Sequence, residues 1–286
     1  MKLKYHRFLL IPFMLVNLSA CSSIISSATG KMANNLSTAI ANNDDLATVR
    51  AGAPAYLLML ESFLEGDPED TNMLISASKL YGAYAGVFVK DEARAKRLTQ
   101  KSLDFSLRAS CLRISNSCEL KTMKFPEFVK VISQYEKDQI DLLFALGTSW
   151  AGWIQVRSGD WNAAADLSKV SKIMQQVIKL DESHESGQAH LYMGVLNTLL
   201  PPALGGKPEV GKTHFEKAIK ISNNKNLMAK VLYAEKYARL MFNQELHDSL
   251  LQQVLKTEPR IRGFTLTNML AQEQAKALLK SGQEYF

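Results

Sequence analysis

One stretch of the chain has the spacing of a nucleotide-binding loop. Gly206 begins and Thr213 ends the segment G-K-P-E-V-G-K-T, which satisfies the pattern G-x-x-x-x-G-K-[ST]. Phosphate binding by this loop requires a buried strand before it, so that backbone N–H groups converge on the phosphates. Residues 190–200 instead have helical spacing and lead into two prolines. The segment therefore predicts a tight turn whose last glycine permits close helix packing, and we expect no nucleotide site.

No other group of polar residues has the spacing of a catalytic or metal site. His184 and His190 stand six positions apart, outside any H-E-x-x-H ligand set, and no G-x-S-x-G elbow occurs. Acidic residues in turns are explained by helix capping. An enzyme acting on cell-wall polymers stays a distant hypothesis, testable by alanine replacement of Glu65 and Glu209. The sequence predicts a protein that is not an enzyme and that uses no cofactor.

Two cysteines have the spacing of a local disulfide. Cys111 and Cys118 are seven positions apart in a chain that we expect to be exported to an oxidising compartment, where such pairs commonly join. A ring of this size adds about 2.5 kcal/mol by the loop-entropy estimate. A metal site is the weaker alternative, because no histidine or further cysteine lies at ligand spacing nearby.

The third cysteine follows an export signal. Lys2, Lys4 and Arg7 precede an apolar run over residues 8–18, which is too short to span a bilayer and ends in Leu-Ser-Ala-Cys. This tetrapeptide resembles the lipobox of bacterial lipoproteins, which predicts removal of residues 1–20 and acylation of Cys21. An ordinary secretory signal is the alternative. Ser22, rather than Asp, after the cysteine implies by resemblance an outer-membrane destination.

Charge does not point to a nucleic-acid partner. The chain of 286 residues has a formal charge of +6, and removing the signal lowers this value to +3. No later stretch has the apolar length of a membrane span, so the lipid would be the only membrane anchor. Residues 21–48 are rich in small polar side chains and are expected to form a tether, although Met32, Leu36 and Ile40 have the spacing of a short amphipathic turn.

Residues 49–286 have helical periodicity nearly throughout. Apolar and small residues recur every three or four positions, with charged residues on the neighbouring face. The apolar stripes are Ala95, Leu98, Ser102, Phe105 and Ala109; Leu167, Val170, Met174 and Val177; and Leu227, Val231, Ala234, Ala238 and Met241. Helix-stop and helix-start signals separate them at residues 65–68, 158–161, 222–224 and 257–259. The sequence predicts an all-α fold.

Small residues suggest that these helices form repeats. In a tetratricopeptide unit, small residues twelve positions apart let two helices approach closely. Gly152 and Ala164 have this spacing, as do Ala83 and Ala95. Gly194 and Gly211 would match with about five inserted residues. We therefore expect four divergent tetratricopeptide-like helical hairpins in a right-handed, solenoid-like stack, whose concave surfaces would suit binding.

Aromatic residues and prolines are the candidate ligand-binding residues. Each of them is explained most simply as repeat core, but together they are consistent with an apolar cavity or pore in which hydroxyl and indole N–H groups supply polar contacts. The candidates are Tyr56, Tyr81, Tyr84, Trp150, Trp153, Leu200, Pro201, Pro202 and Leu204.

The chain resembles the T component of tripartite ATP-independent periplasmic (TRAP) transporters, the TatT family, from about Gly52 to Phe286. The most specific segment is Leu-Pro-Pro-Ala-Leu-Gly-Gly-Lys-Pro-Glu at residues 200–209, supported by Leu-Glu-Gly-Asp-Pro at 64–68 and Trp-Ala-Gly-Trp-Ile-Gln at 150–155. The resemblance implies a lipid-anchored, all-helical, tetratricopeptide-like protein that assembles as a homotrimer with pores. It further implies pairing with the periplasmic solute-binding P subunit and a role in the uptake of apolar ligands.

Two functions from different classes follow. The leading hypothesis is a transport accessory that accepts an apolar or amphipathic solute and passes it to the P subunit. The alternative is a tetratricopeptide-type scaffold for envelope or outer-membrane protein assembly. A solute tunnel should be lined by Leu, Met, Tyr and Trp, whereas a peptide-binding groove should present Asn, Lys and Arg on its concave face.

Overall fold

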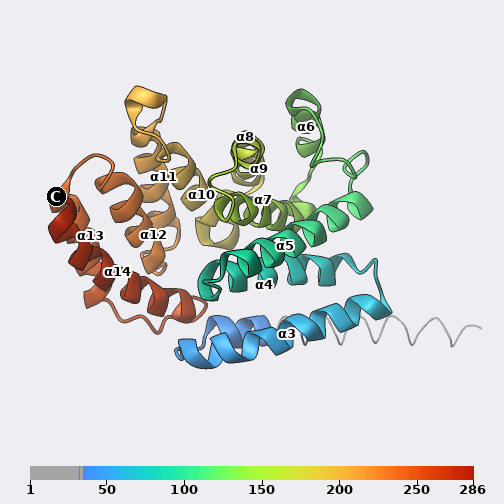
Figure 1. The fold of residues 1–286 in the computed structure, drawn as a ribbon, viewed down its shortest axis with the longest axis horizontal. Coiled ribbons are helices and arrows are strands. Elements are labelled where there is room, and N and C mark those ends of the chain that lie inside the picture. The colour runs from blue at the N-terminus through green and yellow to red at the C-terminus, as the bar shows by residue number, and fades with distance from the viewer. Residues whose placement is uncertain (1–31, 33–34) are drawn as a thin grey trace, which may run out of the picture.

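The protein is helical in a computed structural model that describes residue 32 and residues 35–286 (Figure 1). Besides a short helix at residues 35–41, twelve labelled α-helices follow one another as antiparallel neighbours, and the described residues contain no β-strand. The α-helices are α3 (Leu46–Gly66), α4 (Thr71–Phe88), α5 (Glu92–Arg113), α6 (Phe125–Ile132), α7 (Ile140–Gln155), α8 (Trp161–Ala165), α9 (Leu167–Leu180), α10 (Gln188–Asn197), α11 (Pro208–Ile221), α12 (Leu227–Leu232), α13 (Gln244–Lys256) and α14 (Thr265–Tyr285). The predicted all-α class is confirmed.

Several helices end at the stop signals that the sequence predicts. α3 ends at Gly66, α11 ends at Ile221 and α13 ends at Lys256, each next to a predicted stop signal. The Asp160 carboxylate accepts a hydrogen bond from the backbone N–H of Asn162 and so caps the first turn of α8. These ends are set by local chemistry, because a side-chain cap satisfies backbone groups that the helix itself leaves unpaired.

The core has two large parts that meet at α10. The first part fills the space among α3 to α10, and the second fills the space among α10 to α14. Figure 1 shows the consequence: the stack arches through α7 and α10, and its last helices return toward α3. A smaller cluster on α3 and α4 contains Ala53, Leu57, Tyr81 and Tyr84.

The folded body begins earlier than residue 49. Residues 35–41 are helical, and Leu36 and Ile40 of this helix pack against the first core. The next residues contact the far end of the chain, because Asp44 pairs with Arg260 at 2.8 Å. Within the expected tether over 21–48, the Leu36 and Ile40 spacing thus forms a short helix packed on the body. Cys21 and the signal over residues 1–20 lie outside the described residues.

Two glycines let α10 and α11 approach closely, as predicted. A Cβ atom at Gly194 would lie 2.6 Å from the Phe215 ring, and one at Gly211 would lie 3.0 Å from the carbonyl oxygen of Gly194. Neither position has room for a side chain unless a neighbour moves. The sequence expectation of a close Gly194–Gly211 contact is confirmed.

The two other predicted small-residue pairs do not make the close helix contacts. Ala83 is exposed, and α4 approaches α5 instead at Gly82, where a Cβ atom would lie 2.9 Å from the Ser102 hydroxyl. Ser78 and Ser102 reinforce that contact by donating hydrogen bonds to each other's carbonyl oxygens at 2.8 and 2.7 Å. A Cβ atom at Gly152 would meet no atom within 4 Å. Close packing is one residue away from the predicted position on α4.

A π-helical turn, η4 (Tyr233–Ala238), interrupts the last predicted stripe. At its C-terminal end the backbone N–H of Arg239 donates a hydrogen bond to the carbonyl of Ala234, five residues earlier, at 3.2 Å. A π turn holds more residues than an α turn, so the positions that follow rotate relative to the core. The predicted stripe is therefore wrong at Met241, which is 39% exposed, although its four earlier members are buried.

Candidate functional site

The structure does not bring the nine candidate ligand-binding residues together in one cavity. They lie in four places: a groove beside α3, a tyrosine cluster between α3 and α5, a cation–aromatic cluster on α7, and an exposed loop before α11. Each place has its own chemistry.

Tyr56 lies in a groove between the helix at residues 35–41 and α3. The groove has a volume of about 380 Å³ and is mainly apolar. A hydrogen bond links the Tyr56 hydroxyl to Ser37, and burial raises the pKa of Tyr56 above its ordinary value. Of the nine candidates, Tyr56 is the one that lines this groove.

Tyr81 and Tyr84 pack between α3 and α5. Both rings are buried, and cations cover their faces: the Lys101 ammonium lies 5.5 Å from the Tyr81 centroid, and the Arg94 guanidinium lies 5.5 Å from that of Tyr84. The Tyr81 hydroxyl donates a hydrogen bond to the Glu61 carboxylate. Burial, together with that carboxylate, raises the pKa of Tyr81. These tyrosines join α3, α4 and α5.

Trp150 and Trp153 belong to a group that we call the cation–aromatic cluster, with Lys121, Asp166 and Lys169. The Asp166 carboxylate lies 2.6 Å from the Lys121 ammonium and 3.3 Å from that of Lys169, and it accepts a hydrogen bond from the Trp150 indole at 3.1 Å. The Lys121 ammonium lies 3.5 Å from the Trp153 ring centroid. One carboxylate thus pairs with two cations beside two indole rings.

Burial governs the electrostatics of this cluster. It lowers the pKa of Lys121, while the neighbouring Asp166 carboxylate acts in the opposite direction. Trp150 is fully buried and its ring meets Phe128 edge-on, with centroids 5.8 Å apart. The cluster joins the connection after α5 to α7 and α9, and its side chains fill the space between them. It stabilises the fold, and we assign it no ligand.

The remaining candidates lie on residues 199–206, which we call the exposed loop. Backbone hydrogen bonds shape it: the N–H groups of Leu204 and Gly206 bond to the Pro201 carbonyl at 2.9 and 3.1 Å. A Cβ atom at Gly206 would lie 1.7 Å from the carbonyl oxygen of Leu200, so only glycine fits there. The loop contains the 3₁₀ turn η3 (Pro202–Leu204). Its backbone is fixed although its side chains point outward.

Apolar side chains of the exposed loop lie in solvent. Leu204 is 68% exposed, and Leu199, Leu200 and the nearby Val210 are also exposed. Figure 1 shows the connection between α10 and α11 projecting from the upper edge of the body. A contiguous apolar feature on a fixed backbone is typical of a contact with another molecule.

The geometry of residues 206–213 is not that of a phosphate-binding loop. The segment follows α10, and its later residues lie inside α11. The backbone N–H of Gly211 bonds to the Lys207 carbonyl at 3.0 Å, so it does not point at a free anion site. Gly211 serves helix packing, as the sequence predicted.

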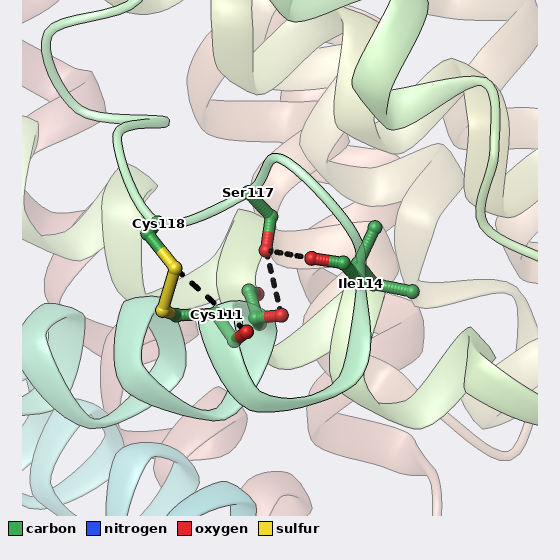
Figure 2. The surroundings of a disulfide bond; sticks show 5 residues. Cys111, Ile114, Ser117 and Cys118 are labelled. Atoms are coloured by element: carbon green, nitrogen blue, oxygen red, sulfur yellow. Dashed lines mark hydrogen bonds between the residues drawn. A yellow bond between two sulfur atoms is a disulfide. The ribbon is translucent and has the colours of Figure 1, made fainter.

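The structure joins Cys111 and Cys118 in a disulfide at the end of α5, with Cα atoms 4.3 Å apart. Figure 2 shows how the intervening turn is held: the Ser117 hydroxyl shares its one proton between the carbonyl oxygens of Ile114 and Ser110, at 2.7 and 2.6 Å. The bridge and Ser117 fasten the start of the connection that carries Lys121 into the cation–aromatic cluster.

Sequence reasoning missed two tyrosine–carboxylate pairs beside the exposed loop. The Tyr237 hydroxyl donates to Glu209 at 2.7 Å, and the Tyr233 hydroxyl donates to Glu216 at 3.2 Å. Both tyrosines lie on η4, and burial raises the pKa of Tyr237 to about 12. The two tyrosines stand four positions apart and the two glutamates stand seven apart, so each pair of like residues lies on one helix face. This spacing was the signal in the sequence. Glu209 therefore anchors the start of α11.

One group of side chains has ligand atoms close enough for a metal ion. Atoms of Asp141, His184 and Glu185 lie within 4.8 Å of one another. The Lys79 ammonium lies 2.9 Å from Glu185 and 3.5 Å from Asp141. Since this lysine already pairs with both carboxylates, we assign no metal to the group.

His190 and His214 form a pair between α10 and α11. Their Nδ1 atoms are 2.8 Å apart, and the Glu182 carboxylate lies 3.6 Å from Nε2 of His190 and 3.9 Å from the Lys217 ammonium. Burial, and then the neighbouring His190, lower the pKa of His214 to about 4. Burial also lowers the pKa of His190.

This pair should make stability depend on pH. Unfolded His214 takes up its proton near pH 6.5, whereas the folded protein resists protonation down to about pH 4. Its contribution to the free energy of unfolding is therefore complete above pH 6.5 and is lost as the pH falls toward 4. When the pH falls from 7 to 4.5, the free energy of unfolding should decrease in both proteins. We expect the decrease, measured by urea unfolding, to be about 1 to 2 kcal/mol smaller for His214→Asn than for the parent. Equal losses would show that the pair is not responsible.

No helix among residues 32 and 35–286 has the length and apolar character to cross a bilayer.

Comparison with known proteins identifies the family. Residues 42–286 match a family model described as TRAP transporter T-component. A search of curated protein sequences finds no match. The matched region contains α3 to α14, and with them the exposed loop and the cation–aromatic cluster. The family is defined by an accessory role in transport and is not an enzyme family. The chain belongs to the TRAP transporter T-component family.

Proposed function

We propose that the protein is the lipid-anchored, periplasm-facing accessory component of a TRAP-type transport system. Residues 1–20 are removed in this proposal, and acyl chains on Cys21 hold the folded body on the outer membrane. The body binds or channels an apolar or amphipathic solute and pairs with the periplasmic solute-binding P subunit. Family membership supports the transport role, and the residues before Cys21 support the anchor.

The proposal includes the repeat architecture and the assembly. The helix pairs act as divergent tetratricopeptide-like units in a right-handed stack, and three copies form a homotrimer with pores. The close contact between Gly194 and Gly211 supports a repeat-like pairing of α10 with α11. Because Tyr81 and Trp150 are buried among their own neighbours, the solute path is proposed to form at other surfaces, including those where subunits meet.

The exposed loop is the observation that carries the proposed pairing with another protein. Its backbone is already ordered by its prolines and internal hydrogen bonds, so a partner would bind it with little loss of conformational entropy. Burying Leu200 and Leu204 would remove apolar surface from water. We therefore place the contact with the P subunit at this loop.

Two other helices carry exposed aromatic residues. Figure 1 places α6 and α8 along the same edge of the body as the connection between α10 and α11. The first residues of these two helices are the exposed aromatics Phe125 and Trp161. Exposed tryptophan is frequent among the residues that dominate binding energy at interfaces.

The test replaces Leu204 with lysine and measures binding to the solute-binding P subunit of the same TRAP-type system. We expect Leu204→Lys to weaken that binding at least tenfold, about 1.4 kcal/mol, because a charge must be buried where an apolar side chain was. Surface plasmon resonance on the mature chain with Cys21→Ser gives the affinity. Native mass spectrometry of the same sample reports the number of subunits.

Leu58 provides a matched control. It is 67% exposed on α3, against 68% for Leu204, and it lies far from the exposed loop in the chain. Leu58→Lys should bind like the parent. Equal binding by both variants would remove the loop from the interface. Loss of the trimer without loss of binding would assign the loop to contacts between copies, and failure of the parent to bind any solute-binding protein would favour the scaffold alternative.

A further inference from the structure

We propose that the groove between the helix at residues 35–41 and α3 binds one acyl chain of the lipid carried by Cys21 of the same protein. We call it the N-terminal groove. This inference rests on the lipidation included in the proposed function, and it adds a place on the folded body where that lipid binds.

The groove has the size and lining of a site for a small apolar ligand. Its volume of about 380 Å³ lies in the range of roughly 300 to 1,000 Å³ common for small-molecule sites. Apolar side chains from both helices form most of its wall. They are Leu36, Ala39, Ile40, Val49, Ala53, Ala55, Tyr56 and Met59.

Gly52 lines the groove and adds no side chain to it. It lies well inside α3, where glycine is less favourable than alanine. Close packing does not explain it, because a Cβ atom at Gly52 would meet no atom within 4 Å. Gly194 differs in this respect, since its missing side chain makes room for Phe215. The missing side chain at Gly52 instead leaves space that opens into the groove.

The lining favours a hydrocarbon chain over a peptide. The polar side chains at the groove already have partners: Asn43 accepts a hydrogen bond from the Asp45 backbone at 2.8 Å, and the Thr48 hydroxyl donates to the Asp45 carboxylate. The Tyr56 hydroxyl is hydrogen-bonded to the Ser37 side chain. A peptide would lose hydration of its backbone amides without replacing those hydrogen bonds, whereas an acyl chain has none to lose.

The covalent link makes Cys21 a strong candidate source of that chain. The wall of the groove starts at Leu36, fifteen positions after Cys21. Fifteen residues span at most about 50 Å when extended, so the groove lies within reach of the anchor. A ligand held by so short a connection has an effective concentration of about millimolar, far above that of a free fatty acid. The remaining acyl chains would stay in the bilayer and keep the anchor there.

Hydrogen exchange on the lipidated protein tests the proposal. The mature protein, reconstituted in phospholipid nanodiscs, is compared with its Cys21→Ser form mixed with the same nanodiscs, and intact mass confirms the lipid. We expect amides of residues 36–43 to exchange at least fivefold more slowly when Cys21 is acylated. Equal exchange in the two forms would overturn the proposal, and so would an intact mass without the lipid.

Gly52→Leu and Gly86→Leu separate groove filling from other effects. Both glycines lie in helices, and a Cβ atom added at either would meet no atom within 4 Å, but Gly86 lies on α4 outside the groove. Gly52→Leu should abolish the difference between acylated and non-acylated protein, and Gly86→Leu should keep it. Both variants should melt no earlier than the parent. Persistence of the difference in Gly52→Leu would place the acyl chain elsewhere.

A fluorescent fatty acid gives an independent readout. The Cys21→Ser protein should bind cis-parinaric acid, and Gly52→Leu should weaken this binding at least tenfold while Gly86→Leu leaves it unchanged. If the parent binds the probe only after residues 22–31 are deleted, the chain's own N-terminal segment fills the groove and the proposal is wrong. Neither readout uses the P subunit, so loss of the partner contact and loss of the groove site are distinguishable.

Discussion

Replacing Asp166 with asparagine should lower the free energy of unfolding by about 3 kcal/mol. The asparagine has the shape of the aspartate and can still accept a hydrogen bond from Trp150, but it cannot neutralise Lys121 and Lys169. The Asp166 side chain is only 14% exposed and that of Lys169 only 10%. Removing the anion leaves the buried Lys169 ammonium and the partly buried Lys121 ammonium without their shared counter-charge. Urea unfolding of the Cys21→Ser protein at pH 7 measures the loss.

A surface ion pair supplies the comparison. Glu92 and Lys96 are paired one helical turn apart on α5, with the Glu92 carboxylate 76% exposed. Glu92→Gln should leave the free energy of unfolding almost unchanged, because water solvates both groups when the pair is broken. If Asp166→Asn costs no more than Glu92→Gln, the cation–aromatic cluster does not have the structural role that its geometry indicates.

Replacing Gly194 with alanine should destabilise the protein by about 1 to 3 kcal/mol. The new methyl group would lie 2.6 Å from the Phe215 ring. That ring is fully buried and packs on Tyr233, with centroids 5.6 Å apart, so it cannot move away at low cost. Thermal and urea unfolding of the variant give the size of the effect.

The same substitution at Gly86 should have the opposite sign. Gly86 is exposed on α4 with no neighbour within 4 Å, so alanine there should add about 0.5 to 1 kcal/mol through helix propensity. Adding Phe215→Leu to Gly194→Ala should recover part of the loss, because the smaller side chain relieves the clash. Destabilisation of both glycine variants by equal amounts would contradict close packing as the reason for Gly194.

Local features of the sequence determined the helices of this protein. Stop signals ended α3, α11 and α13, because capping and turn preferences depend on residues a few positions apart. The spacing of Cys111 and Cys118 also predicted a short-range bridge, for the same reason. Family membership was visible in the exposed loop, whose prolines and glycines fix a backbone that few other sequences can adopt.

Tertiary structure alone decided which side chains meet. Lys121 and Asp166 are 45 positions apart, and no periodicity in either segment indicates that they pair. Close approach of α4 to α5 occurs at Gly82 and not at Ala83, because a one-residue change in facing direction depends on how two helices cross. The π-helical turn η4 also changes the direction of the residues that follow it, and Met241 is exposed for that reason. Sequence spacing specifies a helix and its faces, whereas contacts between faces depend on packing geometry that the spacing does not contain.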